Sequence, residues 1–492
     1  MTAMNHGLSR LDNLFKVCLK DEGPNGPPLP RSFGRLLPAN PVHLQNLSHA
    51  ELIEIYDDLV EEMRATANKD GSADAGMTFL GQFVDHDITM DATSALGKKI
   101  DPSTIPNVRT PALDLDCVYG AGPDATPHLY GKEDTSEYLL FGRNDNPLDL
   151  ARTSVGTALI GDPRNDENVI VSQIQGAFIC LHNILMDKVA SGDMSATVQQ
   201  CAQMGVDPKA WARYVPEHLR SFEEVRRFIR LHYQWIIWHE LLPAFCDQAC
   251  LDAAMGTDPF GHDAPVMPVE FSGAAYRFGH ATTQAKYHLR EGEAQLGLFA
   301  TAGFGPRPES ANLAFDQFFA IHGSTPQKSR PVGTALGGPL FEMPFVKEGM
   351  HLEDINHDLT LAQSKKLALR NIIRDRYTYQ LASGQSMARH LGLSPRHPPE
   401  HLKKKGISKT PLWFYCLEEA DDAHGKLAGV GGTIVASVFA RLLRLDSNSF
   451  VHAHGFQPWN GFGGEDTVLG GLLKFVEKNR DSVTHAEHLR CG

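Results

Sequence analysis

The sequence predicts a single large, mainly α-helical domain with long loops and little β-structure. Several long stretches show apolar residues recurring every three or four positions, which is the period of a helix with one buried face. Alternating strand-like runs are few and short, and we find no internal repeat and no low-complexity tract. The helical stretches are residues 51–67, 170–190, 222–244, 361–374 and 432–445.

The segments between these helices are rich in Gly, Pro, Asn and Asp, above all residues 90–135 and 251–270. Residues 22–30 carry closely spaced prolines and cannot be helical. A chain of 492 residues could hold two or three domains, yet no break in composition separates them. We therefore expect an N-terminal arm, one domain and a C-terminal tail, at residues 1–32, 33–478 and 479–492.

Composition excludes several classes of protein. The formal net charge of −13 argues against a nucleic-acid-binding surface, which requires a basic stripe. No run of eighteen or more apolar residues exists, so we expect no transmembrane segment. The N-terminus lacks the apolar core of a secretory signal, and the eight cysteines form no C-x-x-C pair. We expect reduced thiols in a protein that is cytoplasmic, or exported without a conventional signal peptide, and of unknown oligomeric state.

The most informative motif is GQFVDHD, residues 81–87. On a helix, Gln82, Asp85 and His86 stand at i, i+3 and i+4 and share one face, whereas Asp87 is rotated by about 100°. A buried cluster of this kind is costly unless each group has a partner or a metal. The motif alone fits a functional pocket, a hydrogen-bonded structural helix or a surface helix.

A second motif is GDPRNDEN, residues 161–168. Asp162 suits the N-cap of a helix and Pro163 its first position. Arg164 and Glu167 then lie three residues apart on one face, where they could form no more than a local ion pair.

An acidic motif lies within the loop 90–135, in TPALDLDCVYG, residues 110–120. If residues 110–116 are extended, Thr110, Asp114 and Asp116 point to the same side. Hydroxyl, carboxylate and carbonyl oxygens are the ligands that hard cations such as Ca²⁺ prefer. The alternative is a solvated acidic turn.

Two further motifs place a polar pair at helical spacing. Arg277 and His280 in YRFGH share a face, although such a histidine could be an ordinary hydrogen-bonded core residue. Asn371 and Arg374 in RNIIR repeat the arrangement, and could form only the polar edge of an amphipathic helix.

Taken in order, GQFVDHD, TPALDLDCVYG, GDPRNDEN, YRFGH and RNIIR resemble the motifs of the animal-type haem peroxidases of the peroxidase–cyclooxygenase superfamily. The resemblance runs from about Phe33 to residue 478, nearly the whole chain. The absence of a secretory signal and of a cysteine framework makes the chain similar to a compact, microbial-type member. The resemblance implies haem b, hydrogen peroxide and small electron donors as cofactor and substrates.

Roles for individual residues follow from the resemblance. On the distal side of the haem, His86 would be the acid–base catalyst, Arg164 would stabilise developing negative charge, and Gln82 would help to hold water or halide. On the proximal side, His280 would bind the iron and Asn371 would orient it. The remaining proximal residues match arginines near the haem propionates, Arg277 and Arg374.

The resemblance also implies covalent haem and a calcium ion. Asp85 and Glu167 match the carboxylates that form ester bonds to haem methyl groups. Asn168 stands where a third link, from methionine, occurs in some members, so we expect iodide, bromide, thiocyanate or phenols rather than chloride as donors. The predicted calcium ligands are Asp87, Thr110, Ala112, Asp114 and Asp116.

Three other functions compete with this reading. A cyclooxygenase-like fatty-acid dioxygenase would need a tyrosine three residues before the proximal histidine, but Tyr276 stands four before His280. An HD-type metal phosphohydrolase would need further metal-ligating histidines around His86 and Asp87. A haem-binding or adhesive protein without catalysis would be expected to have lost the catalytic set.

Two other patterns are set aside. The glycine-rich run 429–432 lacks the strand and acidic residue of a nucleotide-binding loop, so it indicates close helix packing. His452 and His454 have no third ligand nearby in sequence and are expected at the surface.

Overall fold

The computed structural model describes residues 33–44, 46–90, 96–105, 107–191, 219, 221–261 and 263–491. Within them the chain is mainly helical, as the sequence predicts, and its two sheets are short antiparallel pairs. The predicted arm 1–32 lies outside the described residues, as do residues 91–95 and 106 of the predicted loop 90–135. The domain boundaries themselves stay a prediction.

The α-helices are α2 His49–Glu62, α3 Ala75–Ile88, α4 Asp116–Tyr119, α5 Val169–Ser191, α8 Phe222–Ile236, α9 Leu242–Phe245, α10 Gln248–Gly256, α11 Val269–Ser272, α12 Leu361–Ser364, α13 Leu367–Ile373, α14 Gly384–His390, α15 Glu400–Lys404, α16 Leu412–Asp422, α17 Gly429–Leu445 and α18 Val468–Asn479. The strands are β1 Lys286–Tyr287, β2 Leu296–Gly297, β3 Met350–Leu352 and β4 His357–Leu359. Two 3₁₀ helices, η4 Pro163–Asp166 and η7 Ala275–Thr282, and two π-helical turns, η6 Ile237–Leu241 and η13 Arg374–Thr378, complete the elements used below.

All five predicted helical stretches contain helix, but three of them differ in detail. The first begins at a Ser48–Glu51 capping box and already ends at Glu62. The stretch 222–244 contains the π-helical turn η6 between α8 and α9. The stretch 361–374 divides into α12 and α13, and Arg374 begins a π-helical turn. Periodicity therefore located the helices but did not detect the local changes in helical pitch.

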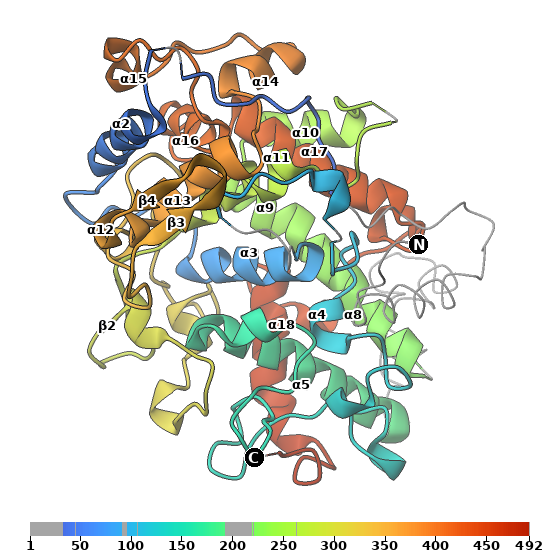
Figure 1. The fold of residues 1–492 in the computed structure, drawn as a ribbon. Coiled ribbons are helices and arrows are strands. Elements are labelled where there is room, and N and C mark those ends of the chain that lie inside the picture. The colour runs from blue at the N-terminus through green and yellow to red at the C-terminus, as the bar shows by residue number, and fades with distance from the viewer. Residues whose placement is uncertain are drawn as a thin grey trace, which may run out of the picture.

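Helix α3 lies near the middle of the molecule (Figure 1). On one side it packs against α5, where the rings of Phe83 and Phe178 stack with centroids 5.2 Å apart. On another side it packs against η7, where Tyr276 donates its hydroxyl proton to the Gly81 carbonyl at 3.2 Å. The helix that carries GQFVDHD is thus enclosed on several sides by core elements.

The glycine run 429–432 begins α17, which packs against α10 and α16. A β-carbon at Gly431 would lie 2.9 Å from the Cys416 side chain, and one at Gly432 would lie 2.8 Å from the Cys250 sulfur. The run therefore permits close helix packing, as the sequence predicts.

One helix among the described residues, Val169–Lys188 of α5, is long and apolar enough to cross a membrane, with a mean hydropathy of 1.6. Its whole length is buried inside the fold, as in the core helix of a globular protein. The C-terminal segment also belongs to this packed unit, since Cys491 and Leu489 form backbone hydrogen bonds with residues 141–152.

Candidate active site

Helix α3 presents the GQFVDHD side chains as predicted. Gln82 and Asp85 are partly accessible, whereas His86 is buried on the same face. Asp87 is completely buried and directed elsewhere, because it accepts hydrogen bonds from the Leu115 amide at 3.2 Å and the Tyr233 hydroxyl at 3.1 Å. The sequence therefore assigned the two faces of the helix correctly.

His86 is held by a residue to which the sequence assigned no role. Its Nδ1 lies 2.7 Å from Oδ1 of Asn165, which is fully buried. Burial, assisted by the positive charge of Arg164, lowers the pKa of His86 to about 4, although Asp85 opposes the shift. The imidazole is consequently neutral near pH 7 and can accept a proton.

The GDPRNDEN motif forms the short 3₁₀ helix η4 rather than the start of a long helix. Asp162 is its N-cap, as predicted, and accepts a hydrogen bond from the Arg164 amide at 2.9 Å. The suggested pair between Arg164 and Glu167 is wrong, because Arg164 instead forms a bidentate pair with Asp162 at 3.0 and 2.7 Å. The buried Asp162 carboxylate attracts the guanidinium more strongly than a partly solvated neighbour at i+3 can.

The guanidinium of Arg164 also binds helix α3 directly. Its Nη2 donates to the carbonyls of His86 at 3.1 Å and Thr89 at 2.6 Å. These bonds fix the positive charge beside His86 before any ligand binds, which is the arrangement that electrostatic catalysis requires.

A chain of amides and a carboxylate lies on the same side. The Gln82 amide donates to Glu167 and accepts from Asn168 at 3.1 Å. Burial, reinforced by the charge of Asp85, raises the pKa of Glu167 to about 7 even though Arg164 opposes it. Asn168 also accepts from the amides of residues 170 and 171, so it caps α5. This capping role is a second contribution that the sequence did not reveal.

A buried network of ion pairs holds η4 in place through Asp166. Arg152 forms a bidentate pair with Asp166 at 2.7 and 2.8 Å and also binds Asp149 at 3.0 Å. The chain passes so close at Gly303 that a β-carbon there would lie 1.9 Å from the Asp166 carbonyl oxygen. Only glycine fits this approach, which allows the Gly303 amide to donate to the Glu167 carbonyl at 2.9 Å.

The second predicted histidine lies on η7. In a 3₁₀ helix residues three apart eclipse one another, so Arg277 and His280 share a face as predicted. The side-chain amide of Asn371 approaches Nδ1 of His280 at 3.0 Å, bringing together residues 91 positions apart. Burial, with the nearby charges of Arg277 and Arg374, lowers the pKa of His280 to about 3 and keeps it unprotonated.

Two polar atoms near His280 lack a hydrogen-bond partner among the described residues. They are the buried Nε of Arg277 and Oδ1 of Asn371. A 180° rotation of the Asn371 amide would let Oδ1 accept from Nδ1–H and would leave Nε2 of His280 free. Next to the histidine, a β-carbon at Gly279 would meet no atom within 4 Å. This region therefore has both open space and buried polar atoms that lack a hydrogen-bond partner among the described residues.

The acidic motif also converges, although not as an extended run. Residues 111–114 bend, Leu115 has a left-handed φ of 61° and α4 begins at Asp116, so the prediction of an extended segment is wrong. The curvature brings carboxylate oxygens of Asp87, Asp114 and Asp116 within 4.8 Å of one another. It is the single His/Cys/Asp/Glu group of this kind in the described part of the chain, and it contains no histidine.

The charge of this cluster is only partly balanced by the protein. Thr110 donates its hydroxyl to both Asp114 oxygens at 2.9 Å, and Arg109 approaches Asp116 at 3.4 Å. Burial raises the pKa of Asp116 to about 7 despite Arg109, and burial with its acidic neighbours raises that of Asp87 well above its usual value. Such an arrangement suits a bound divalent cation. Arg109 also pairs with Asp162 at 2.9 Å, which connects the cluster to Arg164.

Comparison with known proteins gives these features a family. The sequence profile of the animal haem peroxidase family matches residues 91–329. The fold is similar to peroxidase A from Dictyostelium discoideum, with 15% identity, 90% of this chain and 94% of that chain covered, and a TM-score of 0.55. The sequence match and the fold likeness confirm the predicted resemblance to the peroxidase–cyclooxygenase superfamily.

The superfamily likeness extends to plant enzymes. A fatty acid α-dioxygenase from Oryza sativa has 15% identity, with 93% of this chain and 81% of that chain covered, and a TM-score of 0.53. One from Arabidopsis thaliana has 14% identity, with 91% and 76% covered, and a TM-score of 0.52. At these identities the likeness concerns the fold. No protein with a curated description matches the chain.

The match to the animal haem peroxidase family implies a haem cofactor, and the residues present fit one. An unprotonated His280 next to open space suits an iron ligand, and Arg277, whose Nε is buried without a partner, suits a haem propionate. The family profile covers Arg164 and His280 but neither His86 nor Asn371. For those two residues, the support comes from the geometry of α3 and α13.

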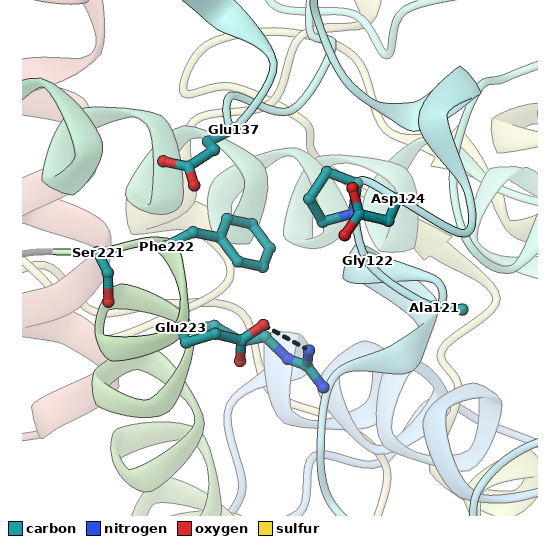
Figure 2. A pocket seen from close by; sticks show the side chains of 9 residues that line it. Ala121, Gly122, Asp124, Glu137, Ser221, Phe222 and Glu223 are labelled. Carbon is teal, nitrogen blue, oxygen red and sulfur yellow. Dashed lines mark ion pairs between the residues drawn. The ribbon is translucent and has the colours of Figure 1, made fainter. Parts of the chain in front are cut away.

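A separate surface hollow of about 290 Å³ is lined by α8 and the segments around residues 121–124 and 137 (Figure 2). It contains the carboxylates of Asp124, Glu137 and Glu223, the last in a 3.6 Å ion pair with Arg226. None of the predicted site residues lines it. The exposed histidines 452 and 454 likewise take no part in the site, as predicted.

Proposed function

We propose that this protein is a haem-dependent peroxidase that reduces hydrogen peroxide and oxidises halides, pseudohalides or small aromatic donors. One observation carries the proposal: a neutral, anchored His86 lies beside the fixed charge of Arg164, while a second unprotonated histidine, His280, is held by Asn371. The two histidines lie on elements that pack together, since the hydroxyls of Thr78 of α3 and Thr282 of η7 form a hydrogen bond at 2.8 Å.

Each residue then has a defined task. Bound haem would supply the iron at which the O–O bond of peroxide is broken. His86 accepts a proton from one peroxide oxygen and returns it to the other, a transfer worth roughly 10²–10⁴-fold in rate. Arg164 stabilises the negative charge that develops as the bond breaks. Gln82 holds the water or donor side of the pocket through its bonds to Glu167 and Asn168.

The donor range follows from Asn168. An asparagine has no sulfur with which to form a third, methionine-type link to haem, and its amide instead caps α5 and binds Gln82. We infer that iodide, bromide, thiocyanate and phenols are oxidised more readily than chloride.

We also propose ester bonds from Asp85 and Glu167 to the haem. Both carboxylates are partly accessible on the His86 side of the site. The raised pKa of Glu167 is consistent with a carboxyl group that has no strong ion-pair partner of its own. Haem that resists acid–organic extraction and adds its mass to the intact chain would test these links, and Asp85→Asn and Glu167→Gln would assign them.

A calcium ion is the proposed occupant of the acidic cluster. Asp87, Asp114 and Asp116 converge there, with the Thr110 hydroxyl beside Asp114. The carbonyl groups of Thr110 and Ala112 would complete the ligand set. Because Asp87 belongs to α3, the ion would fix the position of the helix that carries His86, a structural task.

A fatty-acid dioxygenase is the second candidate, favoured by the fold likeness to the two plant α-dioxygenases. Tyr276 lies on η7 near Asp85, but its hydroxyl donates to the Gly81 carbonyl and its ring stacks on Phe271 at 4.7 Å. The HD-type phosphohydrolase loses support, because the convergent acidic group lacks histidine.

The deciding experiment is an absorption spectrum of the purified chain supplemented with haem, before and after a small excess of peroxide. We expect a Soret band that shifts with peroxide and returns when bromide, iodide or a phenol is added. Oxygen uptake with a long-chain fatty acid, and no spectral response to the small donors, would favour the dioxygenase. Folded protein without any Soret band would contradict both.

A further inference from the structure

The amide that holds His86 belongs to a longer buried chain of hydrogen bonds. Oδ1 of Asn165 lies 2.7 Å from Nδ1 of His86, and Nδ2 of Asn165 donates to Oε1 of Gln175 at 2.9 Å. Nε2 of Gln175 in turn donates to the Cys117 carbonyl at 3.2 Å. Both amide side chains are fully buried, so no solvent competes for these bonds.

The direction of this chain is determined at its far end. A backbone carbonyl can only accept, so Gln175 must present its NH₂ group to Cys117 and its oxygen to Asn165. Asn165 must then present its NH₂ group to Gln175 and its oxygen to His86. Nδ1 of His86 therefore has an acceptor facing it and must carry the ring proton. In a neutral imidazole this leaves Nε2 as a proton acceptor.

We propose that Asn165, oriented by Gln175, is a positioning residue that fixes His86 in its Nδ1-protonated tautomer and thereby makes Nε2 the catalytic proton acceptor. The inference rests on the proposed peroxidase function for its consequence, but the tautomer itself can be measured independently. The bond from Gln175 to the Cys117 carbonyl joins α5 to α4 across 58 positions of the chain, so the relay also ties the tautomer to the packing around α3.

The measurement is the C–O stretching band of the carbon monoxide complex of the reduced, haem-loaded full-length protein at pH 8. A neutral ring without a proton on Nε2 cannot donate to carbon monoxide, so we expect one high-frequency band that is insensitive to D₂O. Asn165→Leu removes the acceptor and frees the ring to protonate at Nε2. We expect a second, lower-frequency band that shifts in D₂O and a 10- to 100-fold slower reaction with peroxide.

Matched variants separate tautomer control from folding. Asn165→Asp keeps an acceptor for Nδ1–H and should keep the single band, including if Asn165→Leu does not fold. Gln175→Leu touches no atom of His86 but removes the group that orients Asn165, so it should show a weaker form of the second band. The double variant His86→Leu, Asn165→Leu should lose that band, which assigns it to the His86 ring.

The outcomes distinguish the two levels of the argument. An unchanged spectrum in Asn165→Leu overturns the inference, whether or not the rate falls, because a lower rate alone would reflect only a structural role. A second band with an unchanged peroxide rate supports the relay and contradicts His86 as the proton acceptor in the proposed function.

Discussion

The two histidine-bearing sides of the site differ in how completely the protein itself satisfies their polar groups. Around His86, Arg164 has acceptors in Asp162 and in two backbone carbonyls, and Asn165 is bound at both ends of its amide. Around His280, the Arg277 Nε and the Asn371 Oδ1 are buried without a partner among the described residues.

The difference indicates that the His86 side is preorganised, whereas the His280 side has polar groups that a ligand could bind. A buried polar group without a partner costs about 1–3 kcal/mol, so such groups persist where something else binds them. The His86 side already has the geometry for proton transfer, whereas the proposed haem would supply the missing partners on the His280 side. Mutations on the two sides should therefore fail in different ways, and the following predictions test this contrast.

The largest effect, loss of haem binding, is expected from a substitution on the His280 side. His280→Ala should abolish haem binding at equimolar haem, because the sole iron ligand proposed on this side is removed. Titration followed by the Soret band measures this, and added imidazole should restore the band by occupying the space next to Gly279. In contrast, His86→Leu should keep the Soret band and lose only reactivity. Equal haem loss in both variants would break the comparison.

On the preorganised side, loss of a support should reduce rate without loss of haem. The Asp162 carboxylate holds Arg164 in a bidentate pair and also balances the charge of Arg109. Asp162→Asn removes this negative charge from both arginines. Misplacement of a charged group by about 1 Å costs on the order of 100-fold in rate, which stopped-flow mixing with peroxide would detect. Arg109→Gln keeps the pair between Asp162 and Arg164, so it should have a smaller effect. A larger effect of Arg109→Gln would contradict this order.

Calcium removal should act on stability more than on chemistry. At calcium concentrations 100-fold above Kd, binding stabilises the folded state by roughly 3 kcal/mol, and Asp114→Asn should lose most of this. Thermal melts with calcium and with chelator measure the difference. Asp252→Asn on α10, whose exposed carboxylate accepts a hydrogen bond from Gln248 at 2.8 Å, is the control and should melt like the wild type. An equal melting temperature of the wild type with calcium and with chelator would exclude a stabilising ion.

The smallest effect is expected from the carboxyl group of Glu167 in haem-free protein. Its folded pKa, about 7, lies above its unfolded value, so the folded state retains a proton that the unfolded state has released. Stability from this group is complete at low pH and is lost as pH rises from about 4.5 to about 7. Glu167→Gln should reduce this pH dependence by roughly 1–3 kcal/mol, measured as urea unfolding free energies at pH 4.5 and pH 7.5. An unchanged pH slope would show that the group titrates normally.

The sequence by itself determined the features that depend on a regular period or on order along the chain. The shared face of Gln82, Asp85 and His86, and the different direction of Asp87, follow from 3.6 residues per turn. The family resemblance followed from motif order, and the mainly helical fold from apolar periodicity. These are local properties, so they could be read before any tertiary contact was known.

Tertiary structure decided everything that joins distant segments. Asn165 binds Gln175, and Gln175 binds the Cys117 carbonyl, only because η4, α5 and α4 meet beside α3. Arg164 binds Asp162 rather than Glu167, and the acidic loop curls instead of extending, because burial and backbone curvature outweigh sequence spacing. Sequence spacing specifies which side chains can share one face of an element. Which of them become partners depends on where the chain returns, since hydrogen bonds and ion pairs form between atoms that packing brings within about 3 Å.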